Sequence, residues 1–202
     1  CGFSFFDRAG GDADRSLAPS LERFLSKFEE RAPVIFTLGT TIVHHAGDMF
    51  DVAIRAAREI RRPIVLLVGS KGNAETLRDA PDVCVCEYAP HSLLMPRGSA
   101  SIHHAGAGSA AQALRSGRPS VSVPFVNDEF DIAHRMQQLG VSAYLPASRL
   151  RSKSAVRNLA DALWQVTETA SFLERARELG GQIRVESGSA AASTSVEMLA
   201  VR

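Results

Sequence analysis

Short apolar runs alternate with amphipathic segments along most of this chain. Runs of consecutive apolar, often β-branched residues predict strands at 34–39, 64–69, 83–86, 101–103, 120–123 and 141–145. Elsewhere apolar residues recur every three or four positions, which predicts helices at 19–28, 48–60, 73–79, 107–115, 130–139, 151–166, 171–185 and 191–199. The chain therefore alternates strand and helix over nearly its whole length.

This alternation with short connections predicts an α/β fold. Right-handed crossovers place the strands in a Rossmann-like, doubly wound parallel sheet with helices on both faces. Residues 1–18, with Gly-Gly and scattered charge, are typical of a linker, and we expect one domain over 19–202. Such sheets bind ligands outside the carboxyl ends of their strands, so the loops that follow the strands are the places to search.

The composition narrows the functional classes. Lys plus Arg number 23 against 22 Asp plus Glu, which gives no support for nucleic acid or an anionic membrane as the main partner. No apolar run approaches the roughly 20 residues that span a bilayer. We interpret Cys84 and Cys86 as free thiols on opposite faces of a strand, and expect a cytoplasmic protein.

The most informative loop follows the strand that ends at His103. It reads His104-Ala-Gly106-Ala-Gly108-Ser109 and leads into a helix. Small residues let a phosphate approach the N–H groups at a helix start, where the helix dipole favours negative charge. His104 and Ser109 add donors, so we expect an anion site here.

Two other interpretations of this loop remain open. The glycines can simply relieve tight packing while His104 caps a loop. The segment from Gly106 to Ala111 also fits G-x-G-x-x-A, the dinucleotide fingerprint of NAD(P) and FAD oxidoreductases, with Asp128 in the place of the ribose-binding acid. Against that alternative, the motif lies behind a weak strand in the middle of the chain.

Another strand-end loop, Gly39-Thr40-Thr41, offers a close backbone approach and two hydroxyls for phosphate or sugar oxygens. The histidine pairs at 44–45 and 103–104 lack the spacing of a metal site, so we expect no metal ion. No G-x-S-x-G nucleophile elbow occurs either.

Three segments stand in a recognisable order: Tyr88-Ala-Pro-His91, His103-His-Ala-Gly-Ala-Gly-Ser109 and Pro124-Phe-Val-Asn-Asp-Glu129. Together they resemble the donor-binding signature of the GT-B glycosyltransferases of the UDP-glycosyltransferase-like superfamily, which includes sterol, macrolide, glycopeptide and rhamnolipid-type enzymes. The resemblance covers nearly the whole chain and implies the carboxy-terminal, nucleotide-sugar-binding half of that fold.

The resemblance also implies roles for individual residues. Tyr88 stands where the family often places an aromatic against the nucleobase, and His91 where a glutamine lies near base or ribose. His104 matches the histidine that contacts the donor diphosphate, and the loop with Gly106, Gly108 and Ser109 matches the one that holds phosphate. Asp128 and Glu129 match an acid and a glutamine that hold the donor sugar.

Several positions depart from the family pattern. Glu129 replaces a glutamine and so exchanges an amide for an acceptor-only carboxylate, which leaves the sugar open. Gln112 stands where many plant members have a ribose-facing glutamate, and Asp131 where an asparagine is frequent. Asp128 and Glu129 also fit a plain helix N-cap and first-turn acid.

The implied reaction is inverting, metal-independent transfer from a UDP- or TDP-sugar to a hydroxyl of a small-molecule or lipid acceptor, with no cofactor. In this family the catalytic base and acceptor pocket lie in an amino-terminal domain, so we expect that domain as a partner and any membrane contact only through it. We expect this half alone to bind donor without transferring sugar. A donor-binding subunit of a split enzyme is the non-catalytic alternative.

Overall fold

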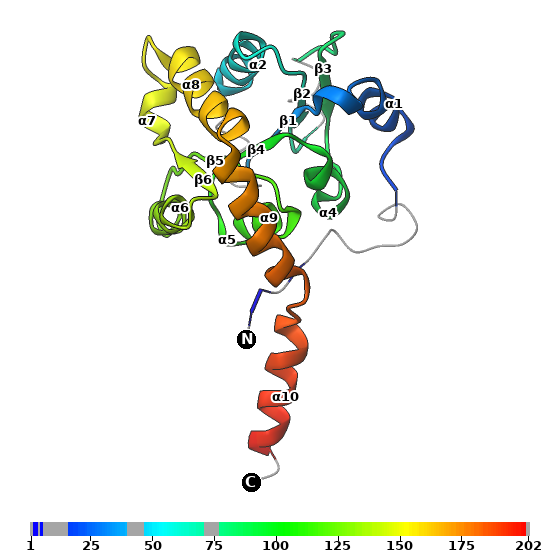
Figure 1. The fold of residues 1–202 in the computed structure, drawn as a ribbon, viewed down its shortest axis with the longest axis vertical. Coiled ribbons are helices and arrows are strands. Elements are labelled where there is room, and N and C mark those ends of the chain that lie inside the picture. The colour runs from blue at the N-terminus through cyan, green and yellow to red at the C-terminus, as the bar shows by residue number, and fades with distance from the viewer. Residues whose placement is uncertain (1, 4, 6–15, 40–46, 71–76, 201–202) are drawn as a thin grey trace.

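The computed structural model describes residues 2, 3, 5, 16–39, 47–70 and 77–200. Six strands form one sheet in the order β3-β2-β1-β4-β5-β6 (Figure 1). Their bounds are β1 Val34–Thr37, β2 Ile64–Leu67, β3 Val83–Cys86, β4 Ala100–His103, β5 Ser120–Ser122 and β6 Ser142–Tyr144. Each neighbouring pair is parallel, as the sequence predicts. The strand order reverses between β1 and β4, which makes their carboxyl ends the expected binding crevice.

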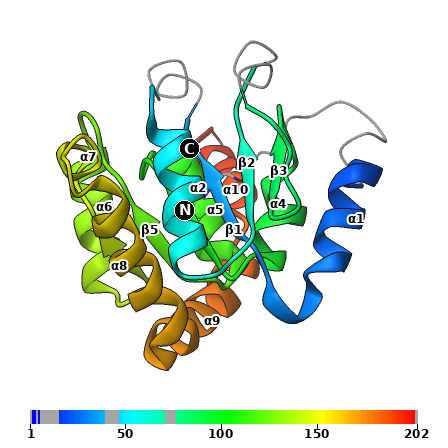
Figure 2. The ribbon, with the colours of Figure 1, turned by 90° about the horizontal axis from the view of Figure 1, so that it is seen from above.

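Helices cover both faces of this sheet (Figure 2). Their bounds are α1 Pro19–Lys27, α2 Met49–Glu59, α4 His91–Leu94, α5 Ala107–Ser116, α6 Glu129–Gln138, α7 Ala147–Leu150, α8 Ala155–Glu168, α9 Ala170–Arg184 and α10 Gly188–Ala200, with short 3-10 turns η2 Glu29–Arg31 and η4 Met95–Arg97. The doubly wound α/β prediction is confirmed.

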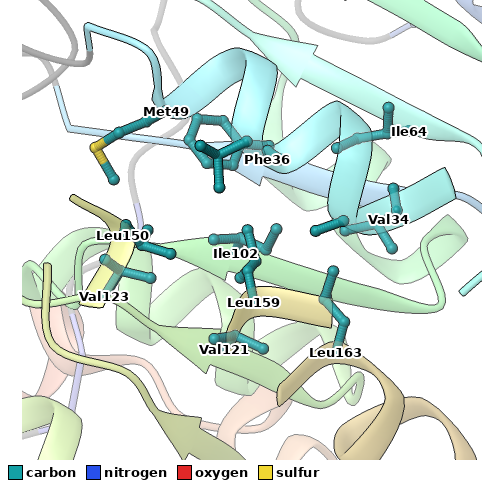
Figure 3. Close-up of a cluster of buried hydrophobic side chains, with 14 of the residues drawn as sticks. Val34, Phe36, Met49, Ile64, Ile102, Val121, Val123, Leu150, Leu159 and Leu163 are labelled. Carbon is teal, nitrogen blue, oxygen red and sulfur yellow. The ribbon is translucent and has the colours of Figure 1, made fainter. Parts of the chain in front are cut away.

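The larger core lies under α2 and α8. Phe36 and Ile102 from the central strands pack there against Leu159 and Leu163 of α8 (Figure 3). The ring of Phe36 meets that of Phe50 edge-on at 5.5 Å between centroids. This apolar layer fixes the carboxyl ends of β1 and β4 next to each other.

The opposite face has two smaller cores. One gathers residues of α1, α4 and the first three strands, and includes Leu17, Leu21 and Cys84. The other joins α5, α6 and α9, with Phe3 and Phe5 packed against it. Leu17 is 5% exposed, so described residues before position 19, including Phe3 and Phe5, also contribute to the folded unit.

Several local predictions were wrong. In the predicted helix 73–79, residues 73–76 lie outside the described part and residues 77–79 are not helical. α8 begins at Ala155 rather than at residue 151, and α4 and α7 were missed because a single turn leaves no periodic pattern. Cys84 and Cys86 share a face, with their sulfurs 3.7 Å apart, because strand side chains alternate with a period of two.

The last helix, α10, extends beyond the body of the domain (Figure 1). Its apolar residues Val196, Met198 and Leu199 are each more than 60% exposed. Over the described ranges, no helix is both long and apolar enough to cross a membrane.

Candidate nucleotide-binding site

His104 lies at the point where the strand order reverses. It follows β4 directly, and its Nδ1 accepts a hydrogen bond of 2.9 Å from the backbone N–H of Gly39, just after β1. A side-chain carbon at Gly39 or at Gly106 would collide with the imidazole ring. The imidazole ring therefore lies between these two glycines, and its packing accounts for the absence of a side chain at both.

This hydrogen bond fixes the proton of His104. Burial lowers the pKa of the imidazole, although the nearby carboxylates of Glu129 and Asp128 oppose that shift. The ring is therefore neutral near pH 7, and because Nδ1 is an acceptor, the single proton lies on Nε2. His104 thus presents one N–H donor of defined position at the crevice.

The start of α5 lies next to this donor. Gly106 is the N-cap residue, and no side chain caps the helix. The first-turn N–H groups of a helix have no partner inside it, so they are available to an anion. Gly108 is exposed, and a side-chain carbon there would meet nothing within 4 Å among the described residues. Contacts within the described part therefore do not explain this glycine, whereas an approaching ligand would.

His103 stabilises the loop between β4 and α5 by a hydrogen bond to the loop backbone. Ala105 adopts a left-handed conformation with φ of 65°, and its N–H donates to His103 Nδ1 at 3.1 Å. His103 is fully buried, and burial, followed by the neighbouring His104 and His91, lowers its pKa to about 3. Its Nε2 has no hydrogen-bond partner among the described residues. His103 is thus a neutral, buried side chain that positions the β4–α5 loop.

Asp128 and Glu129 have separate roles in the structure. Asp128 occupies the N-cap position of α6 but makes no capping hydrogen bond, and it is exposed. Glu129 is only 7% exposed, and its Oε2 accepts from the backbone N–H groups of Phe125 (2.7 Å) and Val126 (3.0 Å). Glu129 therefore shapes the β5–α6 loop, and the exposed Asp128 carboxylate faces solvent beside it.

Tyr88 and His91 lie at the end of the crevice beyond β1. Tyr88 is 36% exposed, and His91 opens α4 with its Nε2 3.2 Å from Thr37 Oγ1 at the end of β1. His91 and Gln112 both line a cavity of about 240 Å³, which Arg115 and Arg184 line as well. The structure brings His91 together with Gln112 across the α4–α5 groove.

The remaining predicted positions are placed as follows. Thr40 and Thr41 lie outside the described residues. Asp131 pairs with Arg135, one turn further along the same helix, at 2.7 Å. Within the part of the chain that the structure describes, no group of three His, Cys, Asp or Glu side chains could hold a metal ion.

Sequence reasoning missed the structural parts played by Gly39 and His103. Gly39 contacts a histidine 65 residues away, and no local pattern marks that pair. A signal did exist for His103: a histidine at the last position of a buried strand needs a hydrogen-bond partner, and the loop backbone provides one. No sequence pattern marked Arg115 and Arg184 as cavity-lining residues, since charged residues at such positions are typical of exposed helix faces.

The parallel sheet with helices on both faces defines a doubly wound α/β domain, and comparisons with known proteins narrow this class. Residues 51–196 match the family described as erythromycin biosynthesis protein CIII-like, C-terminal domain. O-mycaminosyltylonolide 6-deoxyallosyltransferase of Streptomyces fradiae is 35% identical over 93% of this chain and 41% of its own length. A sterol 3-beta-glucosyltransferase of Neurospora crassa is 31% identical over 93% of this chain and 12% of its own.

Solved structures share the fold. The glycosyltransferase of kitacinnamycin superposes with a TM-score of 0.74 at 18% identity, over 96% of this chain and 47% of that one. Spinosyn rhamnosyltransferase SpnG complexed with thymidine diphosphate gives 0.68 at 24% identity, over 83% and 45%. The chain therefore belongs to the EryCIII-like C-terminal-domain family of GT-B glycosyltransferases, and it spans less than half the length of these relatives.

Proposed function

We propose that this chain is the donor-binding domain of a glycosyltransferase that moves a sugar from a nucleoside diphosphate sugar to a hydroxyl of a small-molecule or lipid acceptor. One observation carries the proposal: the Nε2–H donor of His104 and the uncapped start of α5 lie at the same strand-order reversal. The family membership supports it, because the relatives compared are glycosyltransferases by name.

In this proposal the diphosphate lies against the loop from His104 to Ser109. The backbone N–H groups of the first α5 turn and the Ser109 hydroxyl donate to one phosphate, and His104 Nε2–H donates to the other. The exposed Gly108 lets phosphate oxygens reach the backbone. Asp128, and the loop that Glu129 holds, lie toward the donor sugar. Thr40 and Thr41 remain predicted sugar or phosphate contacts.

The nucleoside lies toward Tyr88, His91 and the adjoining cavity. Tyr88 offers a partly exposed ring for stacking on the base, and the cavity of about 240 Å³ beside His91 and Gln112 suits a ribose and part of a base. Two of the structural neighbours are described in complex with thymidine diphosphate, which supports TDP beside UDP as the nucleotide to test.

The proposed reaction is inverting and independent of metal ions. An acceptor hydroxyl attacks the anomeric carbon while the bond to the diphosphate breaks, so negative charge grows on the departing phosphate. The helix start and His104 are already oriented toward that charge, so they stabilise the transition state without reorganising. The base that deprotonates the acceptor lies outside this chain.

We propose an amino-terminal acceptor-binding domain as the partner, joined through residues 1–18, and a cytoplasmic location. The match covers only 41% of the Streptomyces fradiae relative, which supports a partner domain in the rest of the protein. The free thiols of Cys84 and Cys86 support a cytoplasmic location. A split enzyme with two chains is the alternative, and an upstream reading frame that encodes a second Rossmann-like half in the same chain would decide against it.

The dinucleotide alternative has less support. Gly106 is required by the imidazole of His104 rather than by a pyrophosphate turn, and Asp128 lies at the start of α6 instead of at the end of β5. Measured binding of NAD(H) or FAD would favour the dinucleotide alternative instead.

Titration calorimetry with UDP, TDP, NAD and FAD tests the proposal. We expect UDP or TDP to bind and the dinucleotides not to. No heat from either nucleoside diphosphate at millimolar concentration would refute the donor-binding role for this chain.

A further inference from the structure

Cys84 and Cys86 form a close thiol pair on the edge strand of the sheet. They occupy alternate positions of β3, which pairs with β2 alone among the described strands, and their sulfurs are 3.7 Å apart. Cys84 is 7% exposed, whereas Cys86 is only partly buried. Both pack in the small core under α1 and α4. The proposed nucleotide site uses neither thiol.

The two thiols differ in reactivity. The hydrogen bond between them lowers the pKa of Cys86 and raises that of Cys84, whose burial raises it further. The carboxylate of Asp79, which accepts from the Val85 N–H, disfavours both thiolates. Cys86 is the more exposed of the two, so an oxidant reaches its sulfur first, and Cys86 is the group that attacks while Cys84 follows.

We propose that Cys84 and Cys86 are a redox-active dithiol that a low-molecular-weight disulfide oxidises to an intrachain disulfide. The Cys86 thiolate attacks the oxidant RS–SR, forms a Cys86–S–SR bond and releases RS⁻. Cys84 then loses its proton and attacks Cys86 Sγ, and the second RS⁻ leaves. The protein loses two electrons and two protons, and the oxidant becomes two RSH molecules.

The geometry makes this disulfide strained and therefore reversible. Alternate Cα atoms of a strand are about 6.6 Å apart, near the upper limit of about 6.8 Å for disulfides. Closing the bond therefore requires β3 to bend, which an edge strand with one partner permits. Strained disulfides have more oxidising potentials and are the labile ones. The bend falls two residues before Tyr88, on the segment that leads to His91.

The test uses the full 202-residue chain with Cys1→Ser, so that two thiols remain. The chain is equilibrated in glutathione buffers of graded ratio, quenched with N-ethylmaleimide, and its mass is measured. We expect a species two hydrogens lighter that takes up no maleimide, and that dithiothreitol returns to the dithiol. Two glutathione adducts on one chain, or no reaction in any buffer, would overturn the proposal.

Matched variants separate attack from resolution. Cys84→Ser should accumulate one glutathione adduct on Cys86, and Cys86→Ser should react much more slowly. Cys84→Ala, which tolerates burial better, makes the same prediction if the serine variant does not fold. Equal rates for the two single variants would contradict the assigned order. Hydrogen exchange on the wild type should rise in residues 83–94 after oxidation, and unchanged exchange there would exclude the bend.

Discussion

The backbone N–H of Gly39 donates to Nδ1 of His104 across the strand-order reversal, at 2.9 Å. This bond joins the end of β1 to the end of β4 and selects the imidazole tautomer that carries its proton on Nε2. The orientation of the proposed phosphate donor is thus set by the sheet topology itself, because only the β1–β4 pairing brings these two residues together.

We expect His104→Ala to weaken TDP or UDP binding by about 10- to 100-fold, because a hydrogen bond to a charged group contributes roughly 1.5–3 kcal/mol. The affinity for the free nucleoside should change little. Calorimetry with both ligands measures the difference. His134→Ala, which removes an exposed histidine bonded to Gln138, is the control and should bind like wild type. Equal losses for nucleoside and nucleotide would show that His104 does not contact phosphate.

Alanine substitutions at Gly106 and Gly108 should separate an effect on stability from an effect on ligand binding. The new methyl group of Gly108→Ala meets no atom of the described residues within 4 Å, so we expect stability to stay constant or to rise by up to about 1 kcal/mol, as for glycine replaced in a helix. Its new methyl group should still lower nucleoside diphosphate affinity by about 10-fold or more.

Gly106→Ala is the matched variant, because its methyl group collides with His104. It should lose both stability and affinity. Urea unfolding and calorimetry on the pair report the two quantities. Gly108→Ala with unchanged affinity would place the phosphate elsewhere.

Glu129→Ala should destabilise the domain by about 2 kcal/mol, since the N–H groups of Phe125 and Val126 lose a buried carboxylate acceptor. Glu129→Gln keeps an oxygen acceptor and should cost less than about 1 kcal/mol. Urea denaturation compares the two with Asp131→Ala, an exposed change expected within about 0.5 kcal/mol of wild type. Similar losses for Ala and Gln would mean that the negative charge, rather than the acceptor, holds the loop.

His103 should make stability depend on pH. Its folded pKa of about 3 lies below the ordinary value of 6.5, so between these pH values the unfolded chain binds one proton more than the folded chain. Stability is therefore complete above pH 6.5 and falls by up to about 1.4 kcal/mol per pH unit below it. The lowered pKa of His104 adds a contribution of the same sign.

Urea unfolding between pH 6.5 and 5 measures this slope above the range where carboxylates titrate. His103→Met should unfold more easily at pH 6.5 but lose stability with a smaller slope as the pH falls, since the contribution of His103 is then removed. A slope identical to that of wild type would show that His103 does not stay neutral in the folded chain.

The sheet was predictable because its strands are buried on both faces and read as consecutive apolar runs, such as the one ending at Thr37. The helix start after β4 was predictable because Gly106 to Ser109 is a local sequence feature, while the anion site there stays a prediction. The Gly39–His104 bond and the His91–Thr37 contact were not, since each joins segments more than 50 residues apart.

The contacts of Glu129 also could not be predicted from the sequence, although its partners are only a few residues away. Its place in the resemblance implied a sugar contact, while its carboxylate is directed to two backbone N–H groups three and four residues before it. The sugar contact stays a prediction, while the backbone contacts could not be inferred from residue type because they depend on the path of the loop.

The central place of β1 also bears on the order in which the chain folds. The connection from β1 to β2 spans residues 38–63 and that from β1 to β4 spans residues 38–99, and closing the longer connection costs more chain entropy. The half of the sheet formed by β1, β2 and β3 can therefore assemble first, with one edge of β1 unpaired until β4 arrives. His104 reaches its place beside Gly39 only when β1 and β4 pair, so the proposed nucleotide site forms when the two halves of the sheet join.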